Sequence, residues 1–326
     1  MLFEVGPSGA LSKKMQLSSH PQCSLFEQEI VNSAGGGDDD DDDGEKGGAD
    51  EIVVRYCHAE DGAAAGTLRV PLEPDYTTLK KVDVDLHQSG TSAYRMGDPY
   101  DAWFSACLGF PVALIYLGDG KRAILGKTLL PPAAAAAATQ DREKKKTGWI
   151  SSVTSYISSA PPSSDPQPWL TFTDVSPLLV TSEASLQSVN SLLLRDQPME
   201  MYKFRPNLVV DGEGEDAWAE DYWGELALTT SLSGAKHSIL LTANCGRCTS
   251  LNVDYQTGKQ AEGELGTVLK KLMRDRRVDT GAKWNPIFGR YATIAGVEDS
   301  PAVLISVGDE VKVVQRIAER TVFDWP

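Results

Sequence analysis

Apolar residues recur at every second position over most of this chain, and this spacing is typical of half-buried β-strands. The clearest case is residues 82–87, where three aliphatic side chains alternate with two aspartates and a histidine. The same pattern predicts further strands at Ile52–Tyr56, Thr67–Leu72, Val112–Tyr116, Ile239–Thr242, Tyr291–Ile294 and Ala302–Ile305. Short strands therefore dominate the prediction.

Helices are fewer, and three segments have their apolar spacing. The first is predicted to begin with Asp98 as N-cap and Pro99 at the first helical position, which places Cys107 in the core. The others span residues 182–193 and 265–274. Because strands are many, helices are few and no regular βαβ alternation is present, we predict a mainly β fold with α-helices, of the α+β class.

Two stretches of biased composition divide the 326 residues. Residues 33–50, rich in glycine and aspartate, are predicted to form a disordered acidic loop, because like charges repel and glycine is flexible. Residues 131–168, rich in Ala, Lys, Ser and Pro, are predicted to be a linker with a short amphipathic helix over residues 149–157. We therefore expect two domains, at residues 1–130 and 169–326.

Charge and cysteine content narrow the possible partners and compartments. The chain carries 31 basic and 46 acidic residues, a net charge of −15, so nucleic acid is an unfavourable partner. No apolar stretch approaches the ~20 residues that span a bilayer, and the first residues lack the pattern of a secretory signal. The cysteines are scattered and odd in number, five in all, which favours a reducing compartment. We expect an intracellular protein.

The most distinctive local feature is Cys245-Gly246-Arg247-Cys248, in which two thiols are three positions apart. Such a pair can chelate a metal, form a redox disulfide, or consist of two buried cysteines in paired strands. A structural zinc site needs four ligands, and the sequence offers no second CxxC. A redox dithiol needs its first cysteine near a helix N-terminus, whereas both flanks here have the pattern of strands. The pair by itself leaves these three interpretations open.

Further motifs accompany the cysteine pair in a fixed order. They are Ser176–Leu186 (SPLLVTSEASL), Phe204–Val210 (FRPNLVV), Ala219–Trp223 (AEDYW), Asn252–Gly258 (NVDYQTG), Asn285–Tyr291 (NPIFGRY) and Val307–Val311 (VGDEV). From residue 174 to residue 314 the chain thus resembles the MOSC domain, in particular that of the mitochondrial amidoxime-reducing components. The first 130 residues resemble the β-barrel-like domain that precedes the MOSC β-barrel in this family, with its first strand or strands missing.

The resemblance implies that the chain binds a molybdenum cofactor, a pterin dithiolene with a terminal phosphate. Cys248 stands at the position of the metal ligand, and a soft thiolate suits a metal that cycles between two oxidation states. Positions that contact the cofactor in the family are occupied here by Thr181, Ser182, Arg205, Asn207, Gly246, Arg247 and Tyr291. Asp221 matches an acidic position at the active-site side and is expected to orient a proton donor, and Cys245 is expected to line the cavity.

Plain structural roles are the alternative at these positions. Arg205 could make a surface ion pair, and Asn207 could form a turn. Thr181 or Ser182 could cap a helix. Tyr291 could be core packing, and Asp221 a loop carboxylate or a cap.

The function that the resemblance implies is reduction of N-hydroxylated compounds, amidoximes or hydroxylamines, by two-electron oxygen abstraction at molybdenum. The chain has no ferredoxin-like cysteine cluster and no dinucleotide fingerprint. Electrons are therefore expected from a haem protein, a b-type cytochrome with its flavoprotein reductase, in the cytoplasm or in association with mitochondria.

Two other functions stay open. One is a cofactor or sulfur carrier similar to the MOSC domain of molybdenum cofactor sulfurases, although those enzymes also need a pyridoxal-phosphate domain. The other is a degenerate cofactor-binding scaffold, which the missing first strand motivates.

Overall fold

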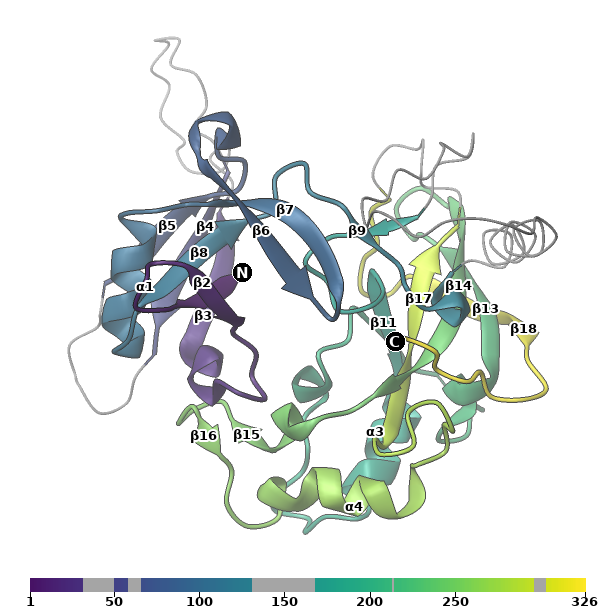
Figure 1. Cartoon of the computed structure of the whole chain (residues 1–326). Coiled ribbons are helices and arrows are strands. Elements are labelled where there is room, and N and C mark those ends of the chain that lie inside the picture. Colours follow the sequence, from purple (N-terminus) through teal and green to yellow (C-terminus); the bar gives the residue numbers. More distant parts are fainter. Residues whose placement is uncertain (32–49, 58–65, 131–167, 213, 296–302) are drawn as a thin grey trace, which may run out of the picture. The chain divides into compact units, whose positions relative to one another are not determined.

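The computed structural model describes residues 1–31, 50–57, 66–130, 168–212, 214–295 and 303–326. Within these ranges the chain forms two compact units, whose elements are labelled in Figure 1. The first unit consists of Met1–Leu86, Gly90–Gly120 and Thr249–Thr267, and the second of His87–Ser89, Lys121–Cys248 and Val268–Pro326. Nearly all of the predicted acidic loop and linker, including the helix at residues 149–157, lies outside the described residues.

Two sheets make up most of the first unit, with the strand orders β2-β1-β8-β7-β6 and β3-β4-β5. Their strands are β1 (Leu2–Val5), β2 (Leu11–Lys14), β3 (Phe26–Val31), β4 (Glu51–Tyr56), β5 (Leu68–Pro71), β6 (Lys80–Leu86), β7 (Ser89–Arg95) and β8 (Val112–Tyr116). In β6, Val84 and Leu86 are buried while the aspartates between and before them are exposed, as the alternation predicts. A short pair, β15 (Val253–Asp254) and β16 (Lys259–Gln260), belongs to the same unit.

Helix α1 (Tyr100–Leu108) closes the core of the first unit, where Cys107 packs as predicted. The predicted helix start is wrong by one residue, because the N-cap is Pro99 rather than Asp98. Asp101 explains the difference: its carboxylate accepts from the Leu114 N–H at 2.8 Å and from Arg95 Nε at 2.6 Å. The first turn is therefore held by neighbouring strands instead of by a capping side chain.

The second unit is built on a six-stranded sheet with the order β12-β11-β17-β14-β13-β18. Its strands are β11 (Leu178–Ser182), β12 (Leu208–Val210), β13 (Trp223–Thr229), β14 (Lys236–Gly246), β17 (Ile287–Ile294) and β18 (Glu310–Arg316). Only β11 and β12 pair in parallel, because the chain between them crosses back through helix α3 (Glu183–Asn190) and a 3₁₀ turn. A two-stranded pair, β9 (Arg122–Ala123) and β10 (Trp169–Leu170), completes the described strands of this unit.

Two predicted helices are confirmed with shorter bounds. Helix α3 covers the middle of the segment predicted at residues 182–193, and α4 (Val268–Asp275) follows a 3₁₀ turn at Leu265–Thr267. The strand predicted at Ala302–Ile305 is wrong over its described part, residues 303–305, which carries no ladder. Apolar alternation there lets Ile305 pack on the sheet core while Leu304 is exposed, but no neighbouring strand pairs with it.

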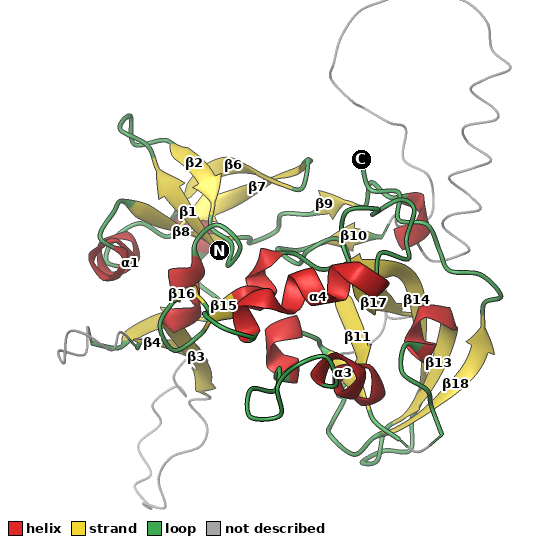
Figure 2. Ribbon diagram, turned by 90° about the horizontal axis from the view of Figure 1, so that it is seen from below, coloured by secondary structure: helices red, strands yellow, loops and turns green. Residues whose placement is uncertain are grey.

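The sheet of the second unit buries a core on each face. On one side Trp223, Leu226 and Ile239 are fully buried together with neighbouring aliphatic residues. On the other side Leu179, Ala243 and Tyr291 form a second cluster. The fold class is thus confirmed as mainly β with α, built of curled sheets (Figure 2). Among the described residues no helix combines the length and apolar character needed to cross a membrane.

Candidate functional site

Three adjacent strands of the second unit bring Cys245 and Tyr291 together. Tyr291 on β17 pairs with Leu179 on β11 and with Ala243 on β14. Side chains alternate between the faces of a strand, so Cys245, two residues after Ala243, lies on the same face. All four residues are buried in one cluster. We call this side of the sheet the Tyr291 face.

Polar contacts cross the Tyr291 face from Arg247 to His87. Arg247 Nη1 donates to Cys245 Sγ at 3.0 Å. The Tyr291 hydroxyl donates to Asp174 Oδ2 at 2.8 Å and also hydrogen-bonds with the Cys245 thiol. The other carboxylate oxygen of Asp174 lies 2.7 Å from His87 Nε2. These five residues are called the thiol cluster below.

Burial sets the protonation of the thiol cluster. It raises the pKa of the Cys245 thiol, although Arg247 and Tyr291 act in the opposite direction. Burial, together with Cys245 and Asp174, raises the pKa of Tyr291 well above its ordinary value. Desolvation opposes ionisation of Asp174, but hydrogen bonds with His87 and Tyr291 outweigh it and lower the pKa. At neutral pH the cluster therefore holds a neutral thiol and phenol between a carboxylate and a guanidinium.

Cys248 lies just beyond β14, and its side chain is exposed. All five cysteines are among the described residues, and none forms a disulfide. The neighbouring Arg247 is buried, and its Nη2 donates to the Phe204 carbonyl at 2.7 Å. Gly246 fits a tight position, since a Cβ there would lie 3.1 Å from Asn285 Cβ. The Cys248 segment is therefore fastened, through Arg247, to the chain immediately before Arg205.

The predicted residues Arg205 and Asn207 are both exposed on the segment that Arg247 fastens. Arg205 ends a 3₁₀ turn in the left-handed conformation, with φ of 55°. Asn207 pairs with β11 twice, because its N–H donates to the Leu179 carbonyl and its Oδ1 accepts from the Leu179 N–H. The Asn207 side chain thus extends the ladder with β11 before β12 begins, which is neither the predicted cofactor contact nor a turn.

Thr181 and Ser182, at the end of β11, are both buried. The Thr181 hydroxyl contacts Met201 Sδ at 3.4 Å, in the 3₁₀ turn that precedes Arg205. Ser182 occupies the N-cap of α3 but makes no side-chain capping bond. Thr181 and Arg247 therefore reach the same 3₁₀ turn from β11 and from the end of β14.

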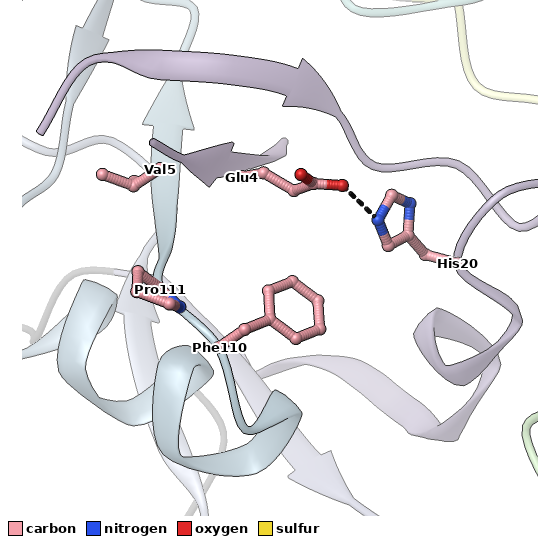
Figure 3. A pocket seen from close by; sticks show the side chains of 5 residues that line it. All are labelled: Glu4, Val5, His20, Phe110 and Pro111. Carbon is pink, nitrogen blue, oxygen red and sulfur yellow. Dashed lines mark hydrogen bonds and ion pairs between the residues drawn. The ribbon is translucent and has the colours of Figure 1, made fainter. Parts of the chain in front are cut away.

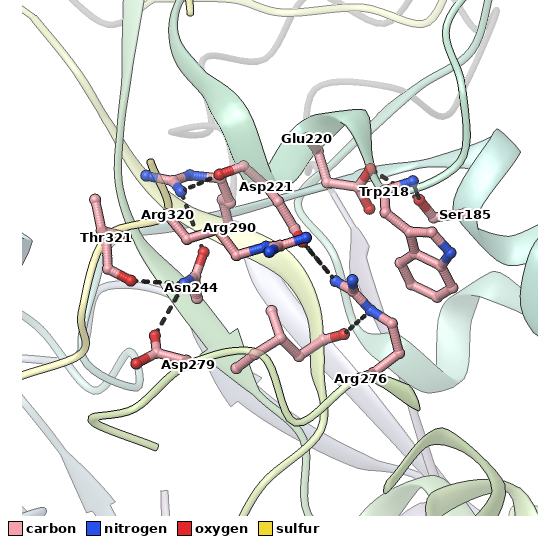
Figure 4. Close-up of polar contacts among 11 residues, drawn as sticks. Ser185, Trp218, Glu220, Asp221, Asn244, Arg276, Asp279, Arg290, Arg320 and Thr321 are labelled. Carbon is pink, nitrogen blue, oxygen red and sulfur yellow. Dashed lines mark hydrogen bonds and ion pairs between the residues drawn. The ribbon is translucent and has the colours of Figure 1, made fainter. Parts of the chain in front are cut away.

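Asp221 lies among arginines (Figure 4). Arg276 Nη2 donates to both carboxylate oxygens at 2.8 and 2.9 Å, and Arg320 Nε donates to Oδ2 at 2.7 Å. Arg290 donates to the Asp221 backbone carbonyl, and it follows Gly289 and precedes Tyr291 on β17. Arg290 therefore points to the face opposite Tyr291. This placement favours a structural role for Asp221 over the proton-orienting role that the sequence predicts.

Glu220, next to Asp221, is also fully buried. Its Oε2 accepts from the Ser185 hydroxyl at 2.8 Å, whereas Oε1 has no partner among the described residues. Burial raises the pKa of this carboxyl to about 7, against the hydrogen bond from Ser185. The same serine oxygen accepts from the Trp218 N–H, so Ser185 joins α3 to the arginine-rich side of the unit.

A cavity of about 310 Å³ lies in the first unit, lined by Glu4, Val5, His20, Phe110 and Pro111 (Figure 3). His20 Nε2 lies 2.7 Å from Glu4 Oε1, and its Nδ1 lies 3.0 Å from the Ser19 hydroxyl. None of the residues predicted from the sequence to be functional lines this cavity.

Comparison with known proteins covers most of the second unit and Thr249–Thr267 of the first. Residues 167–312 match the MOSC domain. Human mitochondrial amidoxime-reducing component 1 is 32% identical over 150 residues, which cover 45% of this chain and 39% of the relative. Component 1 of Xenopus laevis is 34% identical over 148 residues, with the same coverage. Component 2 of Macaca fascicularis is 33% identical over 151 residues, covering 46% of this chain and 41% of the relative. The chain thus spans about two fifths of the length of these curated relatives.

The residues of the MOSC segment fit the molybdenum cofactor with which this domain is associated. A metal can reach Cys248 because its side chain is exposed. Arg247 Nε is buried without an acceptor among the described residues, and it lies one residue from that thiol. An anionic or heteroaromatic group at Cys248 would give this N–H a partner. Over the same described residues, no three His, Cys, Asp or Glu side chains gather in one place.

Sequence reasoning missed Asp174, His87 and the arginines around Asp221. Asp174 stands two residues before the SPLLVTS motif of the MOSC segment, so its position offered a signal. His87 offered none, because it lies in a hairpin turn far from the motifs and adopts a positive φ of 56°. Its link to Asp174 exists only in the folded unit.

Proposed function

We propose that this chain is a molybdenum-cofactor-binding oxidoreductase that reduces N-hydroxylated compounds of the amidoxime or hydroxylamine type. The observation that carries the proposal is the position of Arg247. Its guanidinium bonds Cys245 and Phe204 while its Nε is left without an acceptor beside the exposed Cys248. The names of the curated relatives, amidoxime-reducing components, suggest the reaction class. We take the MOSC domain to extend over residues 169–326.

In this proposal Cys248 is the metal ligand, because a thiolate is the soft donor that molybdenum needs. Arg205, Arg247 and Asn207 offer N–H donors to the pterin and its phosphate. Gly246 lets the chain pass close to Asn285 next to Cys248, and Thr181 supports the turn before Arg205. Ser182 stands at the start of α3, and Tyr291 fixes Cys245 beneath the site. When bound, the cofactor supplies a two-electron redox centre that takes oxygen from the substrate.

Asp221 is assigned a positioning role here. Arg276 and Arg320 already donate three hydrogen bonds to its carboxylate, so this side chain is oriented by the two arginines. Asp174 is the carboxylate of the Tyr291 face, and its lowered pKa keeps it ionised at neutral pH. The thiol cluster can therefore hold the donors around Cys248 in fixed orientations.

The proposed reaction consumes two electrons and two protons for each substrate, so it requires an electron donor. We propose a b-type cytochrome that is reduced by its own flavoprotein reductase. Association with mitochondria is proposed on the names of the relatives. The acidic net charge of −15 disfavours nucleic acid as a partner.

Molybdenum content tests the proposal directly. The chain is expressed in a host that makes the eukaryotic-type cofactor, and metal is measured by elemental analysis in wild type and in Cys248→Ala. Cys57→Ala is the matched control, because Cys57 is an exposed thiol of the first unit. We expect close to one molybdenum per chain in wild type and Cys57→Ala, and loss of metal or a changed absorption spectrum in Cys248→Ala.

The loaded protein is then assayed with an aryl amidoxime, using an artificial one-electron reductant in place of the physiological donor. Formation of the amidine supports the oxidoreductase. Bound molybdenum without amidine formation would favour a cofactor or sulfur carrier. Absence of molybdenum in wild type would refute cofactor binding and leave a degenerate scaffold.

A further inference from the structure

A second cavity lies wholly within the second unit, on the arginine-rich side of the sheet. It measures about 510 Å³, within the usual size of small-molecule sites. Its lining is formed by Asp216, Ala217, Trp218, Ala219, Tyr222, Arg276, Arg316 and Arg320. None of the predicted cofactor-contacting residues is among them. We propose that this cavity binds a small aromatic anion, a ring bearing a carboxylate or a phosphate.

Two of the three guanidiniums of the cavity are anchored on Asp221, which fixes the direction of their remaining donors. Arg276 is anchored on Asp221 through Nη2 and on the Ile287 carbonyl through Nε. Arg320 uses only its Nε for Asp221, so both terminal amino groups lack an acceptor among the described residues. Arginine forks of this kind match the planar geometry of carboxylate and phosphate oxygens.

Arg316 adds a third donor set at the mouth of the cavity. It pairs with Glu215 through Nη2, and its Nη1 has no acceptor in the described part of the chain. Its side chain is 48% exposed, so an incoming ligand can reach it. Because only one amino group is engaged, the guanidinium can bridge Glu215 and a bound anion.

Two aromatic rings favour a ligand with a ring of its own. The Arg276 guanidinium lies 4.0 Å from the centroid of the Trp218 ring, and that of Arg320 lies 4.8 Å from the Tyr222 ring. Each ring is thereby fixed beside a cation, with neighbouring apolar surface from Ala217 and Ala219. Alternating rings and guanidiniums present stacking surfaces together with hydrogen-bond donors.

Net charge by itself does not account for anion binding here. The three arginines are balanced by Asp221, Glu215 and Asp216, so recognition depends on the unused N–H donors. Asp216 differs from the other two carboxylates, because it lines the cavity without a basic partner among the described residues. The negative charge of Asp216 repels an anion bound in the cavity, so removing this charge is expected to strengthen anion binding.

Calorimetric titration of the full chain tests the proposal with benzoate and phenyl phosphate, and with benzyl alcohol as the uncharged analogue. We expect at least one anion to bind saturably with Kd of ~1 mM or below, and benzyl alcohol not to bind. Arg316→Gln and Arg320→Gln should each weaken binding about tenfold, and Asp216→Asn should tighten it about threefold. The Kd of benzoate compared with that of phenyl phosphate shows whether the cavity prefers a carboxylate or a phosphate.

Arg69→Gln is the matched control, because Arg69 is an exposed arginine of the first unit paired with Glu51. It should leave binding unchanged. If Arg320→Gln fails to fold, Arg316→Gln still carries the test, since its arginine contacts only the exposed side of the cavity. The inference is overturned if neither anion saturates, if benzyl alcohol binds equally well, or if Arg69→Gln weakens binding as much as Arg316→Gln.

Cys248→Ala separates this proposal from the proposed function. The cavity lies on the face opposite Tyr291, and none of its lining residues belongs to the thiol cluster. Cys248→Ala should therefore bind the anion as wild type does, with or without molybdenum. Loss of binding in this variant would contradict a separate site.

Discussion

Replacing Asp221 by alanine removes the carboxylate that holds the arginine-rich side of the second unit together. Asp221 is fully buried, and its two oxygens accept three N–H bonds of 2.7 to 2.9 Å from Arg276 and Arg320. The Arg276 side chain is only 7% exposed, so it cannot recover this loss by turning to water. The substitution therefore leaves a buried cation without its counter-charge.

The magnitude follows from this burial. Removing one partner of a buried ion pair costs about 3–5 kcal/mol, because the remaining charge stays desolvated. The Arg320 bond is partly exposed and adds little, so we expect the free energy of unfolding to fall by about 4 kcal/mol. Double replacement by Asp221→Leu and Arg276→Met should recover part of the loss, because neither charge is then left alone.

Urea unfolding followed by tryptophan fluorescence measures this effect through the transition of the second unit. The control is Glu29→Ala, which breaks the Arg55–Glu29 pair, whose side chains are 50% and 56% exposed. That variant should lose no more than about 1 kcal/mol. A loss below about 1 kcal/mol in Asp221→Ala, or a double variant less stable than the single one, would refute the reasoning.

Two further predictions concern Glu220 and Gly281. Burial raises the pKa of Glu220 to about 7 from 4.5, so its stabilising contribution is present in full below pH 4.5 and is lost as the pH rises through 7, by roughly 3 kcal/mol. The melting temperature of the wild type should therefore fall relative to that of Glu220→Gln as the pH rises from 5 to 8. A difference in melting temperature that stays constant over this range would contradict the prediction. At Gly281 a Cβ would overlap the Phe323 backbone carbonyl, whereas at Gly212 it would meet nothing within 4 Å. Gly281→Ala should lower the free energy of unfolding by about 2 kcal/mol while Gly212→Ala changes it little, and equal melting temperatures would count against the packing described.

The sequence by itself determined the local elements of this protein. Strand β8 has the predicted bounds Val112–Tyr116, and β6 buries the aliphatic residues that the alternation selected. Period-two burial is a property of neighbouring residues, so a short window suffices to find it. Colinear motifs likewise sufficed to identify the MOSC segment, because their order and spacing are written in the chain. Two predictions of this kind were wrong, the N-cap at Asp98 and the strand at residues 303–305, since a helix start or a ladder depends on distant partners.

Only the tertiary structure decided which side chains act on one another. Cys245 and Asp174 meet at Tyr291 because β11, β17 and β14 are neighbours, and this register is not visible in any local window. Asp221 and Arg276 are 55 residues apart in the chain, yet Arg276 Nη2 donates to both oxygens of the Asp221 carboxylate. Long-range contacts of this kind depend on sheet order and on the exclusion of water, which sequence periodicity does not encode.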